Sequence, residues 1–415
     1  MEHDRIPAVE ALGRQGLDWL LGQARASHGG LAWPARPGDD GVAFSLYQGT
    51  AGVVLAMLEG QRHFGDDRYG DAALRGARAV AGAIDDGADS SLYSGLSGFA
   101  FVLNAVADVL GDNDSRVAAT RALAVVREEF DGRRWGEFFE LLLGNAGIAT
   151  AALACGDVDL AVRAVEPYVD AAEPTTRGVQ WEPRQDSTYR MHHFSHGTLG
   201  VAYALAAVGD AAGRADLTEL ALAGVADVLP RNEDAPDGFL VPHSDPPHPN
   251  DLTPRYSYGW CHGPAGDAQT FRLLAALTKD PQWTALVESC WHTIAASGLP
   301  QRLEPGFWDN NGRCCGTASV LSLACDRRAD TAADLDFAHV LAADLLQHAT
   351  VDDRGARWSN VEHRATPSRL EPHTGWGQGN AGIVRELLRY VRAATDRDPR
   401  HAAPLPDHPS ADRAA

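Results

Sequence analysis

The stretch Gly49-Thr-Ala-Gly52, followed by the apolar run Val53-Val-Leu-Ala-Met-Leu58, sets the pattern for the whole chain of 415 residues. The same Gly-x-x-Gly motif, or a close variant of it, returns six times: Gly95-Leu-Ser-Gly98, Gly144-Asn-Ala-Gly147, Gly197-Thr-Leu-Gly200, Gly263-Pro-Ala-Gly266, Gly316-Thr-Ala-Ser319 and Gly379-Asn-Ala-Gly382. The first glycines of neighbouring motifs lie 46 residues apart at the closest (49 and 95) and 66 at the widest (197 and 263). Self-similarity at such a period indicates a repeat architecture.

An amphipathic segment precedes each motif, with apolar residues at helical spacing on one side and charged residues on the other. Examples are residues 9–26, 71–84, 115–130, 215–229, 282–296 and 331–349. The run after each motif is apolar nearly all round, as expected of a helix buried on most sides. We therefore predict an all-α fold of seven helical hairpins, with about seven inner and seven outer helices. A closed ring would cover the apolar inner helices better than an open solenoid, so we expect an α/α toroid.

The motif glycines are expected to permit a positive φ and a close backbone approach where each loop meets its helix. Four polar residues within the motifs are candidate caps near the helix N-terminus, because their side-chain oxygens could accept a backbone N–H. These candidates are Thr50, Ser97, Asn145 and Thr198.

The repeats predict one domain over residues 1–395. Residues 396–415 carry several prolines and charges, so we expect a disordered tail there. Long loops are expected at residues 230–256 and 351–376, because the first is rich in Pro, Asp and His and the second is similar. Long loops at one end of a compact scaffold often carry function.

Composition narrows the class of protein. A hydrophobic content of 45% and a charged content of 22% are ordinary for a soluble globular protein. The formal net charge of −20 argues against binding to nucleic acid or to anionic membrane surfaces. No apolar signal region stands at the N-terminus and no stretch of about 18 apolar residues exists, so no membrane insertion is expected. A reducing cytoplasm is therefore the expected compartment, where clustered cysteines indicate metal binding or catalysis before disulfides.

Three of the six cysteines lie at two helix entrances, Trp260-Cys261-His262-Gly263 and Arg313-Cys314-Cys315-Gly316. In a ring of hairpins, equivalent positions of adjacent units share one rim, so Cys261, Cys314 and Cys315 would become neighbours. Three thiolates with one open position match the ligand count of a catalytic zinc site. The alternatives are three buried apolar thiols, a vicinal disulfide, or His262 as a ligand in place of Cys315. The other cysteines, Cys155, Cys290 and Cys325, fall within or at the ends of predicted helices and are expected in the core.

Candidate catalytic side chains lie on the same predicted rim. His196 precedes the fourth motif, one repeat before Cys261, and imidazole is suited to proton transfer near neutral pH. Glu140 lies one unit earlier and could orient His196 or share its acid–base role, with Glu137 as a competitor for that role. Arg255 could hold a carboxylate or stabilise an enolate oxygen. Weaker candidates that border the predicted pocket are Tyr256, Tyr258, His373, Trp376 and Gln378.

Taken together, the repeated Gly-x-x-Gly, the Trp-Cys-His-Gly and the Cys-Cys-Gly motifs resemble the lanthionine synthetase C family of lanthipeptide cyclases, over residues 47–391. The resemblance implies a toroid of seven inner and seven outer helices with Zn²⁺ at one end, held by Cys261, Cys314 and Cys315. Cys315 departs from the histidine of most members and is similar to a three-cysteine variant. His196 matches the family histidine, Glu140 stands where the family has aspartate, and Arg255 is near the family arginine.

The resemblance implies Michael-type addition of peptide cysteine thiolates to dehydroalanine or dehydrobutyrine, which forms lanthionine or methyllanthionine rings. Zinc would lower the pKa of the substrate thiol, and His196 would protonate the enolate that follows addition. Because no kinase, lyase or dehydratase motif is present, the dehydrated precursor peptide would come from a separate partner enzyme. Three alternatives remain: an enzyme that adds glutathione or another free thiol, a non-catalytic zinc-stabilised toroid that binds peptides, and a glycosidase with paired acids at one rim.

Overall fold

Every predicted motif begins a helix in the computed structural model, which describes residues 5–248, 254–301, 310–361 and 368–409. The helices that start at the motifs, called motif helices below, are α2 (Thr50–Phe64), α4 (Leu96–Leu110), α6 (Asn145–Ala154), α9 (Thr198–Ala212), α11 (Pro264–Thr278), α13 (Thr317–Thr331) and α15 (Asn380–Ala394). The helices before them are α1 (Ile6–Gly22), α3 (Asp67–Gly82), α5 (Asn113–Glu128), α7 (Val158–Val165) with α8 (Pro167–Asp170), α10 (Ala215–Val228), α12 (Pro281–Ala296) and α14 (Asp336–His348). Pro167 separates α7 from α8, because proline cannot donate the next helical hydrogen bond.

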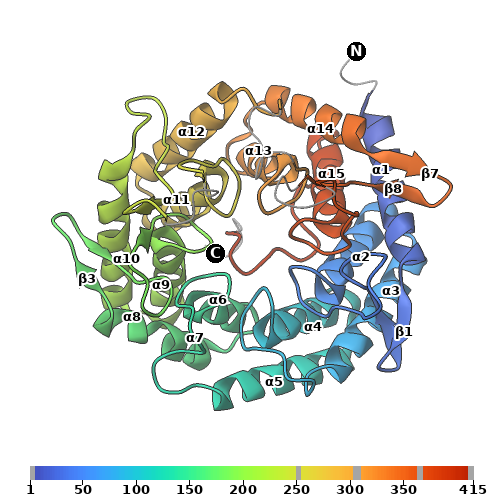
Figure 1. Ribbon diagram of the computed structural model, residues 1–415, viewed down its shortest axis with the longest axis horizontal. Coiled ribbons are helices and arrows are strands. Elements are labelled where there is room, and N and C mark those ends of the chain that lie inside the picture. Colours follow the sequence, from blue (N-terminus) through green and yellow to red (C-terminus); the bar gives the residue numbers. More distant parts are fainter. Residues whose placement is uncertain (1–4, 249–253, 302–309, 362–367, 410–415) are drawn as a thin grey trace. The chain divides into compact units, whose positions relative to one another are not determined.

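The chain divides into two compact units. Unit 1 comprises Met1–Ala88, Gly98–Thr120 and Gly298–Pro404, and unit 2 comprises Asp89–Ser97, Arg121–Ser297 and Leu405–Ala415. In unit 1 the last motif helix, α15, packs against α13, α2 and α1, so the seventh repeat contacts the first (Figure 1). An open solenoid would keep its first and last repeats apart, and this contact therefore favours the closed array that the sequence predicts.

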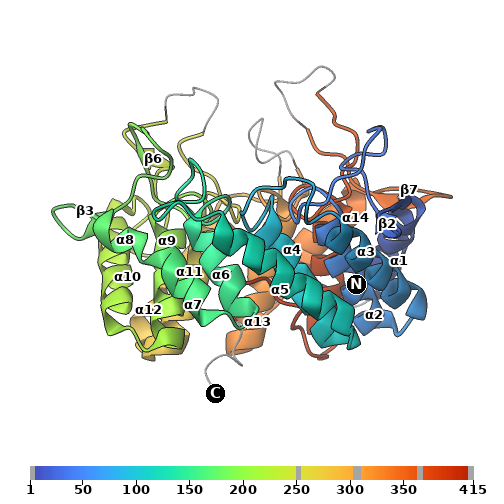
Figure 2. The ribbon, with the colours of Figure 1, turned by 90° about the horizontal axis from the view of Figure 1, so that it is seen from below.

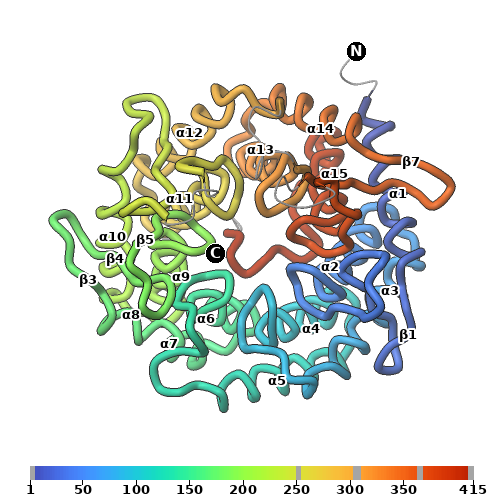
Figure 3. The backbone as a smooth tube through the Cα atoms, viewed as in Figure 1, coloured from blue at the N-terminus to red at the C-terminus, as the bar shows by residue number. Residues whose placement is uncertain are grey.

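Unit 2 repeats the same packing with its own helices. The motif helices α6 and α11 both pack against α9, and each motif helix also pairs with the helix that follows it, namely α7, α10 and α12 (Figure 3). Side chains of α9 such as Val201, Leu205 and Val208 are almost fully buried. The helix α9 is therefore buried on most sides, as its apolar run predicts.

The motif glycines are required for close approach, while the predicted positive φ is wrong. Gly197 has φ −130° and Gly144 has φ −120°. A Cβ on Gly200 would come within 1.9 Å of the Phe194 carbonyl oxygen, and a Cβ on Gly266 within 1.8 Å of the Trp260 carbonyl oxygen. The loop before each of these helices thus folds back onto its first turn, where only glycine leaves room for a carbonyl.

The predicted side-chain caps are also corrected. Glycine is the N-cap of α2, α6 and α9, and no side chain caps these helices. Thr50 instead accepts a hydrogen bond from the Trp33 amide (3.0 Å) and donates one to the Ala43 carbonyl (2.7 Å). Asn145 donates to the Arg133 carbonyl (3.2 Å) in the loop before α6, and the Ser97 hydroxyl donates to the Ser90 carbonyl (2.6 Å). These side chains therefore tie the motif to the preceding loop and not to the helix.

Short antiparallel hairpins and a buried tryptophan follow several of the preceding helices. The paired strands are β1 (Arg25–Ser27) with β2 (Gly30–Ala32), β3 (Glu173–Pro174) with β4 (Val179–Gln180), and β7 (Thr350–Asp352) with β8 (Gly355–Arg357). Each hairpin leads to a tryptophan whose indole N–H donates to a carbonyl in the last turn of the helix before it. The pairs are Trp33 to Leu20 (2.6 Å), Trp181 to Tyr168 (2.9 Å) and Trp358 to Leu345 (2.8 Å). This bond satisfies a carbonyl that a helix C-terminus leaves without a helical partner.

The two predicted loops are largely irregular where they are described. Residues 230–248 carry the end of a 3₁₀ turn (Leu229–Arg231) and β6 (Ser244–Asp245), which pairs with β5 (Arg190–Met191) and lies above α9 and α11 in Figure 2. The second loop begins with the β7–β8 hairpin, which the sequence did not predict. Residues 249–253 and 362–367 of these loops lie outside the described residues.

Residues 396–409, which were expected to be disordered, are packed: residues 396–404 belong to unit 1 and residues 405–409 to unit 2. In unit 1, the Ala402 amide donates to Glu59 (3.0 Å) and Arg385 donates to the Ala403 carbonyl (2.6 Å). In unit 2, Asp407 accepts a hydrogen bond from Tyr93 (2.7 Å). Residues 410–415 lie outside the described residues. Among the helices described, none has both the length and the apolar content that a membrane crossing requires.

Candidate functional site

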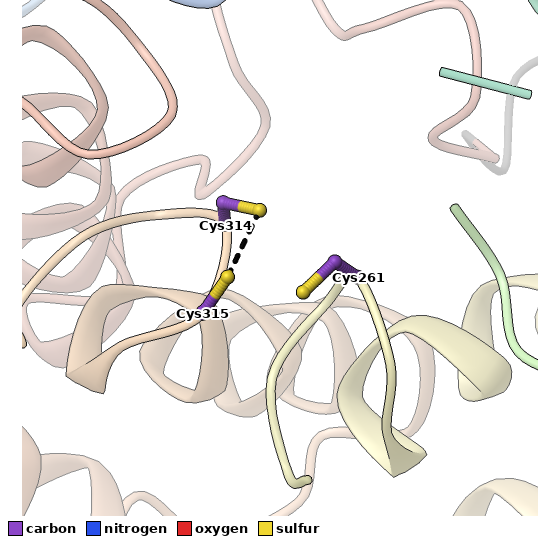
Figure 4. Close-up of side chains that lie close together, drawn as sticks. All are labelled: Cys261, Cys314 and Cys315. Atoms are coloured by element: carbon purple, nitrogen blue, oxygen red, sulfur yellow. Dashed lines mark hydrogen bonds between the residues drawn. The ribbon is translucent and has the colours of Figure 1, made fainter. Parts of the chain in front are cut away.

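The helix entrance of α13 in unit 1 carries two adjacent buried thiols. Cys314 and Cys315 are each 3% exposed, and their Sγ atoms lie 3.2 Å apart, along the dashed line in Figure 4. The turn that holds them is fixed by its backbone, since the Cys314 amide donates to the Gly377 carbonyl (2.8 Å) and the Gly316 amide donates to the Gly312 carbonyl (3.0 Å). The two sulfur atoms are therefore presented together by a rigid turn.

A buried ion pair anchors this turn to α15. The Arg313 guanidinium donates to Glu386 (2.9 Å) and lies over the Trp376 ring, 5.4 Å from its centroid. Burial alone would raise the pKa of Glu386, but the nearby charges of His401, Arg313 and Arg389 lower it below its ordinary value. Glu386 therefore remains ionised, and its charge holds the arginine that precedes the two thiols.

The equivalent entrance of α11 in unit 2 carries Cys261. Its side chain is 3% exposed, and its carbonyl accepts hydrogen bonds from the Ser195 amide (3.1 Å) and the Ser195 hydroxyl (2.9 Å). Ser195 lies immediately before His196 at the entrance of α9. Two consecutive helix entrances of unit 2 are thus joined directly through these bonds.

His196 and Glu140, both predicted from the sequence, form an ion pair in unit 2. His196 Nδ1 lies 2.9 Å from Glu140 Oε2, and Glu140 is buried whereas His196 is 24% exposed. The Glu140 carboxylate also accepts the backbone N–H groups of Leu142 (2.9 Å) and Leu143 (2.7 Å). The carboxylate is therefore held in place and fixes the Nδ1 side of the imidazole.

His262 packs among imidazoles of unit 2. Its ring stacks on His196, with centroids 5.1 Å apart and an interplanar angle of 21°, and it lies 4.3 Å from the His243 ring. Burial lowers the pKa of His262 well below 6.5, and neighbouring histidines lower it further. Burial likewise lowers the pKa of His243 to about 3. Neutral rings therefore border His196, so a proton on His196 meets no like charge from them.

Sequence reasoning missed a second histidine–carboxylate pair. His193 Nδ1 lies 2.8 Å from Asp267 Oδ2, and both side chains are buried in unit 2. Burial raises the pKa of Asp267, although His193 opposes that shift. The signal was present in the sequence, because an aspartate inside an otherwise apolar motif helix requires a polar partner.

Arg255 and Glu137, which the sequence also singled out, have exposed side chains that pair with neighbouring groups. The Arg255 side chain is 56% exposed and donates to Glu233 (2.5 Å) and to the Tyr256 hydroxyl (2.8 Å). Glu137 is half exposed and pairs with Arg184 (2.9 Å). A catalytic role for Arg255 stays a prediction. Glu137 and Glu140 have different partners and different burial, and nothing in these contacts matches the paired acids of a glycosidase.

The chemistry-bearing residues occupy matching positions of successive repeats. His196, His262, Cys315 and Gln378 each stand immediately before the first glycine of their motif. Cys261 and Cys314 stand one residue earlier in theirs. His373 and Trp376, also predicted as weaker candidates, lie in the loop before α15, where burial lowers the pKa of His373. Repeats four to seven thus carry polar or thiol side chains at the same position relative to the first glycine of their motif.

A family model described as lanthionine synthetase C-like protein matches residues 41–247 and 250–340 of the chain. The match therefore covers more than half of the sequence and includes Glu140, His196, Cys261, Cys314 and Cys315. No curated protein matches the chain.

Solved structures share the fold at low sequence identity. Nisin cyclase matches with a TM-score of 0.63 and 16% identity, over 84% of this chain and 88% of that chain. An α-1,6-mannanase variant of Salegentibacter sp. HEL1_6 in complex with α-1,6-mannotriose matches with a TM-score of 0.51 and 10% identity, over 92% and 98%. An unsaturated glucuronyl hydrolase specific for heparin matches with a TM-score of 0.51 and 12% identity, over 94% and 100%. At these identities the matches show the fold alone.

Proposed function

The chain belongs to the lanthionine synthetase C-like family and has its α/α toroid fold, and from that premise we propose that it is a zinc-dependent lanthipeptide cyclase. The proposed reaction adds cysteine thiols of a dehydrated precursor peptide to dehydroalanine or dehydrobutyrine of the same peptide. The precursor would come from a separate dehydratase or kinase/lyase partner. The observation that carries the proposal is the buried Cys314–Cys315 pair at the entrance of a motif helix.

The donor set suits zinc. Cys261, Cys314 and Cys315 are buried and could hold a metal ion, and we propose that these three side chains, drawn in Figure 4, are its ligands. Two thiolates on one tetrahedral zinc lie about 3.8 Å apart, given Zn–S bonds of about 2.3 Å. The Cys314 and Cys315 sulfur atoms, 3.2 Å apart, are near that span and beyond the length of a disulfide bond, about 2.05 Å. Thiolate ligands select soft or borderline metals over magnesium or calcium.

When bound, zinc would lower the pKa of the substrate thiol so that a thiolate is present at neutral pH. Addition forms a bond between sulfur and the β-carbon, and the electron pair of the alkene passes into an enolate. We propose that His196, with Nδ1 facing Glu140, donates a proton from Nε2 to the α-carbon of that enolate. The Glu140 carboxylate, fixed by two backbone N–H groups, would favour the protonated imidazole before transfer and orient the ring throughout.

The neutral rings around His196 support this assignment. A protonated neighbour at His262 or His243 would repel the imidazolium and lower the population of the proton donor. Burial keeps the pKa of His262 and His243 far below neutrality, and of these three imidazoles it is His196 that faces a carboxylate. This contrast favours His196 over His262 as the proton donor.

Metal content and ring formation test the proposal together. Purified protein should contain close to one zinc per chain, and it should convert a dehydrated peptide with internal cysteines into a product with thioether rings and unchanged mass. Loss of free thiols, measured by alkylation and mass spectrometry, reports the reaction. Cys314→Ala should lose the metal and ring formation together, and the matched control Cys290→Ala, at a buried cysteine outside the site, should keep both.

Two other outcomes would overturn the proposal in different ways. A zinc-containing protein that adds glutathione to the dehydrated peptide without closing rings would be an enzyme for free thiols. A zinc-containing protein that binds the peptide and accelerates neither reaction would be a binding toroid.

A further inference from the structure

The Gln378 side chain contacts the sulfur of Cys315 within unit 1. Its Nε2 lies 3.5 Å from Cys315 Sγ and 3.4 Å from the Tyr47 hydroxyl, while its Oε1 lies 3.5 Å from Asn360 Nδ2. Which end of a side-chain amide is oxygen and which is nitrogen is assigned from the hydrogen bonds that its neighbours make. Because Asn360 Nδ2 is a donor, it selects Oε1 on its side, and the Gln378 N–H group faces the sulfur.

The backbone around Gln378 holds this amide in place. The Asn360 side chain donates to the Gln378 carbonyl (2.7 Å) and accepts from the Asn311 amide (2.9 Å), so it links the loop before α15 to the cysteine turn. Gly312 leaves the space for the Gln378 side chain, since a Cβ at that position would come within 2.6 Å of Oε1. The contact between the amide and Cys315 therefore comes from a built network and not from a mobile surface side chain.

A three-thiolate zinc site gives a reason to expect a functional role for the contact between Gln378 and Cys315. A third thiolate in place of a neutral imidazole adds one negative charge around the metal, and hydrogen bonds to ligand atoms tune how strongly those ligands donate. We propose that Gln378 is a positioning residue that hydrogen-bonds the Cys315 thiolate, spreads its charge and raises the affinity of the site for zinc. This inference rests on the zinc site proposed above. It adds an outer partner for the one ligand that departs from the histidine of most family members.

A purely structural role for Gln378 makes a different prediction. If the amide only fastened the loop before α15 to the cysteine turn, its loss would weaken metal binding whichever ligand stood at position 315. A hydrogen bond to sulfur, in contrast, acts only while position 315 is a thiolate. It also changes the energy of the sulfur-to-metal charge-transfer band, which loop packing does not govern.

The test compares Gln378→Leu with Gln48→Leu in the full-length protein. Gln48 occupies the same position in the first motif and has an exposed side chain, so it controls for the loss of a glutamine at a helix entrance. Zinc affinity is measured by competition with a chelator, and the cobalt-substituted proteins are measured by absorption spectroscopy. Gln378→Leu should bind zinc about tenfold more weakly and shift the charge-transfer band to longer wavelength, whereas Gln48→Leu should match the wild type.

The same change in a Cys315→His background completes the test. There Gln378→Leu should alter zinc affinity by less than about twofold, since the sulfur that accepts the bond is gone. Equal losses in both backgrounds, or an unshifted cobalt band, would overturn the inference while leaving the zinc site in place. A wild-type protein that binds neither zinc nor cobalt would overturn the proposed function and this inference together.

Discussion

The entrances of α13 in unit 1 and α9 in unit 2 are built on the same backbone motif and surround their functional atoms differently. In unit 1, the Cys315 thiol contacts a side-chain amide and the Cys314 backbone donates to a carbonyl, while the preceding residue, Arg313, pairs with Glu386. In unit 2, the functional imidazole of His196 pairs directly with a buried carboxylate. The thiol entrance is suited to offering lone pairs to a metal, and the imidazole entrance to holding a proton.

The largest expected effect is on the rate of ring formation, which should fall in variants of the imidazole entrance while their zinc content stays unchanged. His196→Asn removes the proposed proton donor and should lower the rate of ring formation by about 100-fold or more. Glu140→Gln keeps an oxygen for one of the two backbone N–H groups but removes the charge proposed to favour the imidazolium, so its rate should fall by about tenfold to 100-fold. Single-turnover cyclisation of a dehydrated peptide measures both.

Zinc content is the control for these variants, because neither residue is a proposed ligand. Both proteins should retain the zinc stoichiometry of the wild type. A parallel loss of zinc and rate in His196→Asn would show that the imidazole entrance supports the metal site, and the proposed division between the two entrances would fail.

A smaller effect concerns the pH at which each unit loses stability. In unit 2, burial lowers the pKa of His192 and His243 from 6.5 to about 3. Below pH 6.5 the unfolded chain takes up protons that the folded chain refuses, so stability should fall by about 1.4 kcal/mol per pH unit for each such histidine. In unit 1, neighbouring cations outweigh burial and lower the pKa of Glu59 and Glu386 below 4.5, so the contribution of these two carboxylates is lost only as the pH falls below 4.5. Burial also lowers the pKa of His63 and His373, so unit 1 loses part of its stability below pH 6.5 as well.

Native-state hydrogen exchange between pH 7 and pH 5 can resolve these windows. The free energy of opening for amides in α9 and α11 should decrease in this range, because burial lowers the pKa of His192, His243 and His262 in unit 2. It should decrease less for amides in α15, because fewer histidines of unit 1 have a lowered pKa. His192→Gln is the matched variant, because it removes one of these titrations and should reduce the slope in unit 2. An earlier loss of protection in α15 would contradict the contrast.

The elements that sequence could predict are those whose cause is local. An apolar run after Gly-x-x-Gly places each motif helix, and the repeat places Cys261, Cys315 and His196 at equivalent entrances. The hairpins were missed because strands of two or three residues are too short for an alternating pattern to register. Residues 396–409 resemble a disordered segment in composition, and their order depends on distant partners such as Glu59.

The geometry of the candidate site could likewise be predicted where it depends on repeat position, and not where it depends on contacts between distant residues. The pairing of His196 with Glu140 could be anticipated from adjacent repeats. Asp267 in a motif helix signals a polar partner, but the sequence does not indicate that His193 is this partner, because repeat position does not show which way a side chain turns. Asn360 is a further case: it bridges the cysteine turn and the loop before α15, yet nothing near it in the sequence marks it. Contacts between loops of different repeats depend on a packing geometry that local periodicity does not encode.

The smallest expected effect concerns the bond between a buried tryptophan and the helix before it. It tests whether the two units share this structural feature although their functional residues differ. Trp181→Phe in unit 2 and Trp358→Phe in unit 1 each remove an indole N–H bonded to the last turn of a preceding helix. Each leaves a buried carbonyl without its donor and should cost about 1–3 kcal/mol in urea unfolding. Trp283→Phe, at a buried tryptophan for which no such bond is described, controls for the loss of ring size and should cost less. Similar costs at the first two positions would support a common scaffold with separate chemistry. A much larger cost for Trp358→Phe would mean instead that the hairpin of unit 1 also supports the loop that carries Asn360 and Gln378, so that scaffold and site are not independent there.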